Sequence, residues 1–218
     1  MIELLTSSLT QVFVVLIFCT LVWGILRIIR RKIDYKVSLF RFLGLHLHGF
    51  HWNKKFTILF AGIIGLAVSS TVFQYFFINE FFEITKSDNS PYWQILKTGF
   101  SYNSVALALV YCGLKAGLSE EILFRGLIAK RLISKFGYKN GNVAQAFIFW
   151  FLHFLLVGAM TKSWLSSMQM IVLLTIFPIS LLFGFANEKL GGGSIIPSWI
   201  LHASMNFATF LTLAFLFR

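Results

Sequence analysis

Charged residues are scarce in this chain of 218 residues. Lys, Arg, Asp and Glu make up 12% of it, and 57% of its residues are apolar, whereas a typical soluble domain is about 25% charged. So low a charged fraction excludes intrinsic disorder and a coiled coil, and supplies too little polar surface for an ordinary water-soluble domain. Cysteine is also scarce. Cys19 and Cys112 both lie in apolar runs, which argues against a disulfide framework and a cysteine-based zinc site.

Uncharged apolar runs, by contrast, are long and numerous. A helix needs about 20 mostly apolar residues to cross a bilayer, and five of the six runs have 22 residues or more. We therefore predict an all-α, polytopic membrane helix bundle with about six transmembrane helices, because continuous apolar runs do not fit the alternating strands of a membrane β-barrel. The runs are Leu4–Leu26, Phe56–Ile78, Thr98–Leu114, Asn140–Thr161, Ser163–Asn187 and Leu190–Phe217.

Basic residues are shared unevenly between the loops. The net charge is +11, which in a soluble protein would suggest nucleic acid, but in a membrane protein basic residues collect in cytoplasmic loops. When successive loops are assigned to alternate sides, thirteen Lys and Arg residues fall on one side and four on the other. We therefore expect a multi-pass protein of the plasma or inner membrane that binds no nucleic acid. Both termini lie outside in this scheme, and the first run is an uncleaved helix rather than a signal peptide.

A few ionisable side chains interrupt the apolar runs, where each is costly unless it has a partner or a function. Glu121 and Arg125 are four residues apart, so on an α-helix they share a face and form a charge-neutral ion pair. Glu120 is rotated by about 100° from Glu121 and is left free, as a general base in apolar surroundings. Alternatively, Ser119 caps a helix whose first turn holds both acids, which leaves Arg125 unexplained.

Two histidines and an asparagine add neutral polar groups to the later runs. His153 lies in the fourth run, and His202 and Asn206 share a helix face in the last one. Each alone is as consistent with helix packing as with function. Together with Glu120 they can converge on one water or one metal ion. A divalent metal such as zinc, held by Glu120, His153 and His202, fits these groups, and so does a metal-independent glutamate mechanism. The HExxH motif is absent from the sequence.

Three motifs carry a family resemblance over residues 99–210. They are Glu120-Glu121-x-x-x-Arg125, Phe149-x-x-x-His153 and His202-x-x-x-Asn206, in this order on successive hydrophobic segments. The chain thereby resembles the CAAX protease and bacteriocin-processing (CPBP) family, also called Abi or type II CAAX prenyl endopeptidase-like. The resemblance implies an intramembrane protease, described for this family both as metal-dependent and as glutamate-dependent. The catalytic residues that it implies are Glu120, His153, His202 and Asn206. Glu121 and Arg125 match the other fixed positions of the first motif and have a structural, orienting role.

The expected function is therefore that of an intramembrane endopeptidase acting on membrane-associated or lipidated peptides or proteins, with a site open to the cytoplasmic side. Two other functions stay open: a non-catalytic immunity or scaffold protein of the same fold, and a small proton-coupled transporter. The expected partners are a peptide or protein substrate and membrane lipids, and the sequence predicts no oligomeric state. We divide the chain into residues 1–98, with two helices and a basic cytoplasmic loop, and residues 99–218, the catalytic core.

The depth of His153 is at odds with that of His202. If the fourth helix starts near Asn140, His153 lies about 20 Å along it at 1.5 Å per residue, whereas His202 is nearer the inner end of its own helix. Convergence then requires the fourth helix to start late, to tilt or to begin as a loop.

Other polar and small residues have simpler interpretations. His46, His48 and His51 lie in the basic first loop and are expected to be solvated, and the basic cluster of that loop is expected to contact anionic lipid. Gly113-x-x-x-Gly117 predicts a helix-packing face.

Overall fold

The structure is a computed structural model that describes residues 2–217 except 31–36, 88–89, 98, 163 and 165. The predicted run starts at Thr98 and Ser163 lie outside the described residues. Within the described part of the chain, every regular element is a helix, and three of the helices are π-helices. The elements are α1 (Ile2–Arg30), α2 (Leu39–Phe42), α3 (Lys54–Phe77), α4 (Asn79–Thr85), α5 (Pro91–Leu96), α6 (Tyr102–Val110), η1 (Tyr111–Leu118), η2 (Glu121–Ala129), α7 (Lys130–Thr161), α8 (Ser167–Phe185), η3 (Ala186–Leu190) and α9 (Ile196–Leu216).

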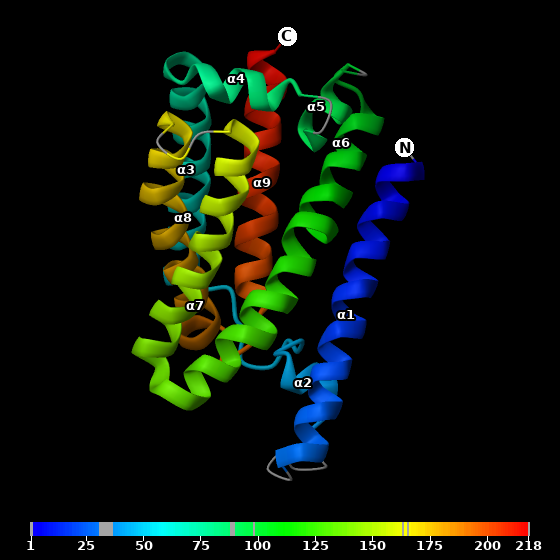
Figure 1. Cartoon of the computed structure of the whole chain (residues 1–218), viewed down its shortest axis with the longest axis vertical. Coiled ribbons are helices and arrows are strands. Elements are labelled where there is room, and N and C mark those ends of the chain that lie inside the picture. Colours follow the sequence, from blue (N-terminus) through cyan, green and yellow to red (C-terminus); the bar gives the residue numbers. More distant parts are fainter. Residues whose placement is uncertain are drawn as a thin grey trace.

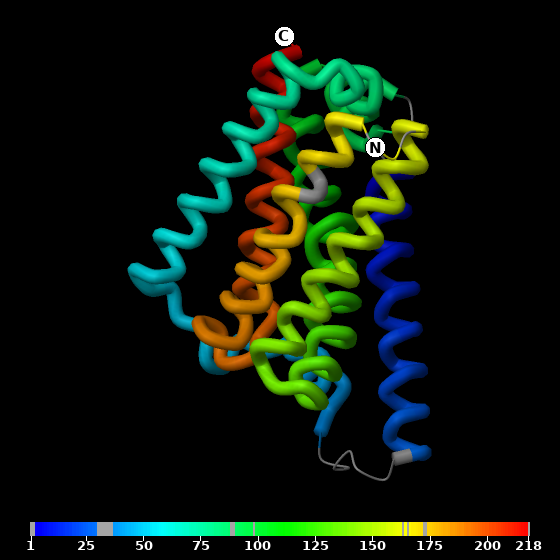
Figure 2. Tube along the Cα trace, turned by 60° about the vertical axis from the view of Figure 1, so that its left-hand side comes forward, coloured from blue at the N-terminus to red at the C-terminus, as the bar shows by residue number. Residues whose placement is uncertain are grey.

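Among the described residues, five helices are long and apolar enough to cross a membrane. One of them, Tyr102–Thr161, is 60 residues long and contains most of the predicted run Thr98–Leu114 and all of the run Asn140–Thr161. At Gly137 its backbone leaves the helix (φ 77°, ψ 166°), a conformation that favours glycine, and the chain folds back on itself. Figures 1 and 2 show the two legs of this hairpin side by side. The predicted all-α, polytopic bundle is confirmed, and one helical hairpin supplies two of its long helical segments.

The bundle has two distinct ends. Both termini lie at the end that also holds α4 and α5, and α2 lies at the opposite end (Figure 1). Helix α1 packs against η1, and α3 packs against α9, so the first two long helices contact the later ones directly. The division into residues 1–98 and 99–218 stays a prediction.

Large apolar side chains of the long helices face outward, and three ionisable side chains lie inside the bundle. Phe13 and Phe215 are 64% and 72% exposed, whereas Glu121, Arg125 and His202 are buried. An apolar outer surface suits contact with lipid, and ionisable groups inside a bundle must find their partners among each other. The buried polar residues therefore locate the part of the fold that can form a functional site.

The segment that carries the two acids is not a regular α-helix. The π-helices η1 and η2 flank Ser119 and Glu120, so the α-helical geometry predicted here is wrong for these turns, in which bonds to the fifth residue replace bonds to the fourth. Ser119 does not cap a helix start either. Its hydroxyl donates to the Lys115 carbonyl inside a continuous helix and accepts a bond from Gln11 of α1 at 2.9 Å. π-Helical turns are rare and concentrate at functional sites.

Gly117 brings η1 close to α9. A Cβ at this position would lie 2.5 Å from the Cys112 carbonyl oxygen, so the turn of η1 itself favours glycine. The same Cβ would lie 3.3 Å from Trp199 Cδ1 and 3.4 Å from the Ala203 Cβ, both in α9, which is a tight contact. A Cβ at Gly113 would meet nothing within 4 Å, although the carbonyl of Gly113 accepts a hydrogen bond from Trp199 Nε1 at 2.7 Å. The predicted packing face therefore lies between η1 and α9, with Gly117 as its point of closest approach.

The hairpin at Gly137 sets Glu120 opposite His153. Glu120 lies 17 residues before Gly137 and His153 lies 16 residues after it, so both are about 25 Å from the turn. The start of α9 is set back from that turn, because Lys130 bonds a carbonyl of the loop that precedes α9. His202, in the second turn of α9, thereby reaches the same depth. Convergence comes from the recessed start of α9 rather than from a late start of the fourth helix.

Candidate active site

The ion pair expected between Glu121 and Arg125 is present and buried. Arg125 Nη1 donates to Glu121 Oε1 at 3.0 Å, and the two side chains are 1% and 0% exposed. The guanidinium also lies over the Phe149 ring, 4.1 Å from its centroid. A buried ion pair is tolerated only when further hydrogen bonds compensate its desolvation, and both partners have such bonds.

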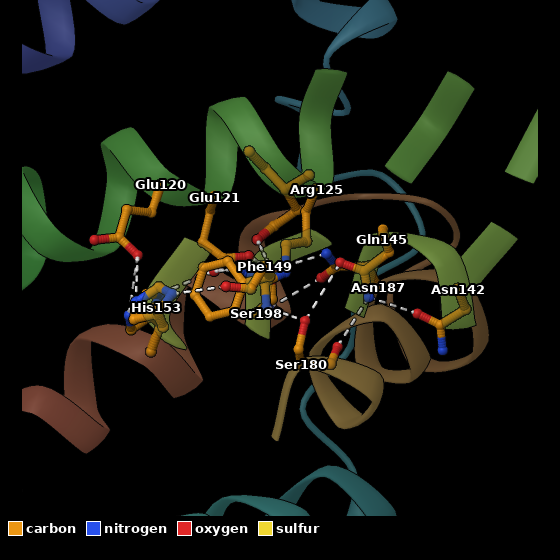
Figure 3. A network of polar contacts seen from close by, with 12 residues as sticks. Glu120, Glu121, Arg125, Asn142, Gln145, Phe149, His153, Ser180, Asn187 and Ser198 are labelled. Carbon is orange, nitrogen blue, oxygen red and sulfur yellow. Dashed lines mark hydrogen bonds and ion pairs between the residues drawn. The ribbon is translucent and has the colours of Figure 1, made fainter. Parts of the chain in front are cut away.

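Uncharged polar side chains support Arg125 from two other helices. Arg125 Nη2 donates to Ser180 Oγ of α8 at 2.9 Å, and Ser180 Oγ donates to Gln145 Oε1 of α7 at 3.4 Å. Gln145 Nε2 in turn donates to the Ser180 carbonyl at 3.1 Å and to Asn142 Oδ1 at 2.9 Å. This chain of contacts, visible in Figure 3, fixes the guanidinium between η2, α7 and α8.

Glu121 accepts hydrogen bonds from three donors. Besides Arg125, they are His202 Nδ1 at 2.9 Å and the Ser198 hydroxyl at 2.5 Å, both from α9. Asn187 holds Ser198 in place, because it accepts from the Ser198 backbone N–H at 3.0 Å and donates to the Ser198 hydroxyl at 2.8 Å. The three donors compensate the buried negative charge and tie η2 to α9.

The contact with Glu121 decides which ring nitrogen of His202 carries a proton. A carboxylate only accepts hydrogen bonds, so His202 donates from Nδ1, and in the neutral ring the lone pair lies on Nε2. That Nε2 faces Glu120 and lies 3.9 Å from Glu120 Oε2. Glu121 therefore orients His202 toward Glu120.

His153 has the same arrangement with a different partner. Its Nδ1 lies 2.9 Å from the backbone carbonyl oxygen of Phe149, and a carbonyl only accepts, so Nδ1 is again the donor. Its Nε2 lies 4.0 Å from Glu120 Oε2. The side chains of Glu120 and His153 point toward each other in Figure 3.

Glu120 Oε2 thus faces two imidazole nitrogens from two different helices. The side chain of Glu120 is 28% exposed, yet its Oε2 atom is buried and accepts no hydrogen bond from any described residue. The separations of 3.9 and 4.0 Å are too long for direct hydrogen bonds. Three acceptor atoms that converge in this way suit a species that carries protons or positive charge.

Asn206 stands apart from this convergence. It lies one turn beyond His202 on α9, and no hydrogen bond joins its side chain to Glu120 or to either histidine within the described residues. Its backbone carbonyl accepts a bond from the Tyr92 hydroxyl at 3.5 Å. Desolvation raises the pKa of Tyr92 well above its usual range, so that hydroxyl keeps its proton. The structure brings three of the four predicted catalytic side chains together and leaves the Asn206 amide outside their contacts.

The three converging groups are of the types that bind zinc. Two histidine nitrogens and one carboxylate oxygen, with a fourth position for water, form catalytic zinc sites, and the unpartnered Glu120 Oε2 is such a donor. Ligands held about 2.0–2.1 Å from a tetrahedral zinc lie about 3.3 Å apart, less than the 3.9 and 4.0 Å seen here. Across the described residues, no group of three or more His, Cys, Asp and Glu side chains has metal-site spacing. The donor types fit a metal, and the two separations between Glu120 and the histidines exceed this ligand spacing by less than about 1 Å.

Lys115 attaches α1 to the segment that precedes the site. Its Nζ donates to Ser7 Oγ of α1 at 2.5 Å. Gln11, one turn further along α1, donates to the Lys115 carbonyl at 3.2 Å as well as to Ser119. Polar contacts therefore hold α1 against the turn before Glu120.

The uncharged residues that support the ion pair have little signal in the sequence. Ser180, Ser198, Gln145 and Asn187 are all buried. Serine and asparagine are common in membrane helices, so their types alone carry little signal. Gln145 is the exception. A long polar side chain inside an apolar run needs a partner, so its position in the sequence already indicates a buried polar contact.

Comparison with known families agrees with the resemblance carried by the motifs. Residues 102–208 match the family model described as type II CAAX prenyl endopeptidase Rce1-like, and this span holds all three motifs. No curated protein and no solved structure matches the chain. Residues 102–208 are therefore similar to the type II CAAX prenyl endopeptidase Rce1-like family, a similarity that is consistent with the CPBP family.

Proposed function

We propose that this protein is an intramembrane endopeptidase that cleaves membrane-associated or lipidated peptides or proteins by means of a water activated by Glu120. One observation carries the proposal. The Nε2 atoms of His153 and His202 lie 4.0 and 3.9 Å from a single oxygen of Glu120 that has no other partner among the described residues. The Rce1-like family supports the same class of reaction.

Glu120 acts first as a base and then as an acid. Its carboxylate takes a proton from the water while the water oxygen bonds to the scissile carbonyl carbon, and the C=O electron pair moves onto oxygen. Glu120 then gives that proton to the amide nitrogen as the C–N bond breaks and the carbonyl re-forms. A single positioned acid–base group contributes about 10²–10⁴ in rate.

The two histidines position the water. Because each Nδ1–H is engaged, each Nε2 presents a lone pair. A water has two hydrogens, so it donates one to Glu120 Oε2 and the other to the Nε2 of one histidine. Glu121 and Arg125 act through His202, whose tautomer and ring orientation they maintain. A divalent metal such as zinc, bound by Glu120, His153 and His202, would supply Lewis acidity and make a bound water acidic near neutral pH.

The developing oxyanion needs a hydrogen-bond donor, which neither histidine offers while its Nε2 carries the lone pair. We assign this role to the Asn206 amide, one turn from His202 on the same helix.

An apolar cavity supports a lipidated or strongly apolar substrate. Its volume is about 370 Å³, and it lies between α3, η1 and α9. Its walls include Cys112, Gly113 and Ala203, which directly follows His202. An apolar chain in this cavity would bring the attached peptide to the level of the three converging groups.

We also propose that both termini lie outside the plasma or inner membrane and that the site opens to the cytoplasmic side. The two termini share one end of the bundle (Figure 1). Arg41 in α2, Lys54 at the start of α3 and Lys130 at the start of α7 lie in the basic connections of the opposite end. Basic residues gather on the cytoplasmic side of membrane proteins.

N-terminal peptide profiling of cell membranes tests the proteolytic function. Membranes that contain the wild-type protein should gain new N-termini that are absent with Glu120→Gln. Glu83→Gln, which changes an exposed acid of α4, is the matched control and should behave like the wild type. On an identified substrate peptide, Glu120→Gln should lower kcat/KM by about 10²–10⁴.

Identical new N-termini from the wild type and a correctly inserted Glu120→Gln variant would contradict the catalytic role of Glu120. Membranes that gain no new N-termini with the wild type would favour a non-catalytic partner protein. Chelation and metal analysis of the purified wild type address the metal. Activity that falls with chelator and returns with zinc assigns a metal role to the three side chains, whereas unchanged activity assigns the mechanism to Glu120 without metal.

A further inference from the structure

A second pocket, partly polar, lies near α2, at the end of the bundle opposite the termini (Figure 1). Its volume is about 760 Å³. Four segments form its walls: residues 37–45 around α2, the following loop, the first two residues of α7, and Gly192–Gly193 before α9. We propose that this pocket binds a phosphate-bearing anion, chiefly the headgroup of an anionic phospholipid.

The charge of the pocket favours an anion. Arg41, Lys130 and Arg131 line it, together with the imidazoles of His46 and His48, and none of the described lining residues is acidic. The acid that reaches this region is Glu188, which lies outside the lining and contacts Lys130 Nζ at 2.7 Å. Two of the three positive charges therefore have no acidic partner among the residues that the structure describes.

Arg131 is held ready for an anion. Its Nη2 donates to the Phe42 carbonyl at 3.0 Å, and its guanidinium lies 3.6 Å from the centroid of the Phe42 ring. An arginine has five N–H donors in a planar fork that matches the oxygens of a phosphate. Because stacking and one hydrogen bond already fix the group, a ligand loses little side-chain entropy when it binds there.

The other two cations also keep donors available. Lys130 Nζ bonds Glu188 and the Gly193 carbonyl, and an ammonium has a third hydrogen. The Arg41 side chain is exposed, and no hydrogen bond or ion pair joins it to a described residue. These donors come from separate segments that only the fold brings to one cavity.

Glycine keeps side chains out of one wall. Gly193 has φ 84°, and a Cβ there would lie 3.1 Å from Lys130 Nζ. A Cβ at Gly44, which has φ 71°, would lie 2.8 Å from the Gly193 carbonyl oxygen. Main chain therefore forms this wall, and Lys130 can lie directly against it.

The position of the pocket favours a lipid as the source of the phosphate. Phe40, 62% exposed, and Val37 and Leu45 add apolar surface beside the cations, which suits a headgroup with attached acyl chains. Basic pockets on the cytoplasmic side of helical membrane proteins recognise anionic headgroups in this way. Binding to this pocket depends neither on proteolysis nor on a metal at Glu120.

Titration of delipidated protein in neutral detergent tests the inference. The probes are dioctanoyl phosphatidylglycerol, dioctanoyl phosphatidylcholine and inorganic phosphate, with native mass spectrometry as the readout. The variants are Arg41→Gln and the double variant Arg41→Gln/Arg131→Gln. Lys54→Gln/Lys55→Gln is the matched control, because it removes two exposed charges at the start of α3 that do not line the pocket.

The wild type should bind phosphatidylglycerol about fivefold more tightly than Arg41→Gln and about 30-fold more tightly than the double variant, with the Lys54/Lys55 control within about twofold of the wild type. Inorganic phosphate that competes with the lipid assigns a site for the phosphate group from either source, whereas phosphatidylglycerol binding without such competition assigns the lipid. Equal losses in the control and the double variant, or equal affinities for the two lipids, would overturn the proposal. If the double variant does not fold, Arg41→Gln alone decides, because its side chain has no described partner.

Discussion

Substitution of Arg125 by methionine isolates the structural part of the site. Arg125→Met removes the guanidinium but keeps a long apolar side chain near the rings of Phe149 and Phe183, which now lie 4.1 and 5.1 Å from it. Glu121, 0% exposed, retains the His202 and Ser198 donors but loses its counter-charge. Removal of one partner of a buried ion pair costs about 3–5 kcal/mol. We expect about 3 kcal/mol here, since two donors remain.

The double variant Glu121→Gln/Arg125→Met provides the decisive comparison. It removes both buried charges, and the Gln carbonyl can still accept from His202. We therefore expect it to recover about 2 kcal/mol relative to Arg125→Met, which is a typical coupling energy for residues in direct contact. The assay is the free energy of unfolding of the two single variants, the double variant and the wild type in mixed micelles titrated with SDS.

Two results would refute this reasoning. One is a loss of less than about 1 kcal/mol in Arg125→Met, and the other is a double variant as unstable as Arg125→Met, since both require the Glu121 charge to be solvated. Glu120→Gln is the internal contrast. The Oε2 of Glu120 has no described partner, so this variant should change the free energy of unfolding by no more than about 0.5 kcal/mol.

Three further predictions concern packing, substrate and topology. Gly117→Ala should lower the free energy of unfolding by about 1–3 kcal/mol because its Cβ would meet the Cys112 carbonyl of η1 at 2.5 Å and the Ala203 Cβ of α9 at 3.4 Å. Gly113→Ala meets nothing within 4 Å and should be neutral, and equal effects of the two substitutions would contradict this difference in packing. Ala208→Phe, which narrows the apolar cavity, should raise KM for a lipidated peptide about tenfold with little change in kcat. Val68→Phe, on the outer surface of α3, is the control and should leave KM and kcat unchanged. Lys55→Cys should react with a membrane-impermeant maleimide from the cytoplasmic side over a low background, since both native cysteines are buried; labelling from outside only would reverse the proposed orientation.

The sequence predicts the helices of this protein well because their signal is local. Each apolar run depends on its own composition, and the need to satisfy backbone hydrogen bonds in a membrane leaves helix as the economical outcome. The Glu121–Arg125 contact is equally local, since residues four apart stay close even where the turns are π-helical. Spacing of this kind separates Glu121, which is paired, from its neighbour Glu120, which is not.

The details of the site depend on contacts that no local pattern records. Ser198 bonds Glu121 across 77 positions of the chain, and Ser180 bonds Arg125 across 55. Gly137 looks like any other glycine in the sequence, yet the reversal of the chain there sets His153 opposite Glu120. Hydrophobicity patterns contain neither kind of information.

By itself, the sequence determined the fold class and the number of apolar helical segments. It also determined which polar side chains need a partner or a function inside a membrane. Residue type and periodicity suffice for these, because burial of charge in a bilayer is costly wherever it occurs. Only the tertiary structure decided which atoms meet: Nε2 rather than Nδ1 of both histidines faces Glu120, and the Asn206 amide lies outside their contacts. Tautomer, separation and convergence depend on how helices pack against each other, and that packing was set by close approach at Gly117, reversal at Gly137 and the recessed start of α9.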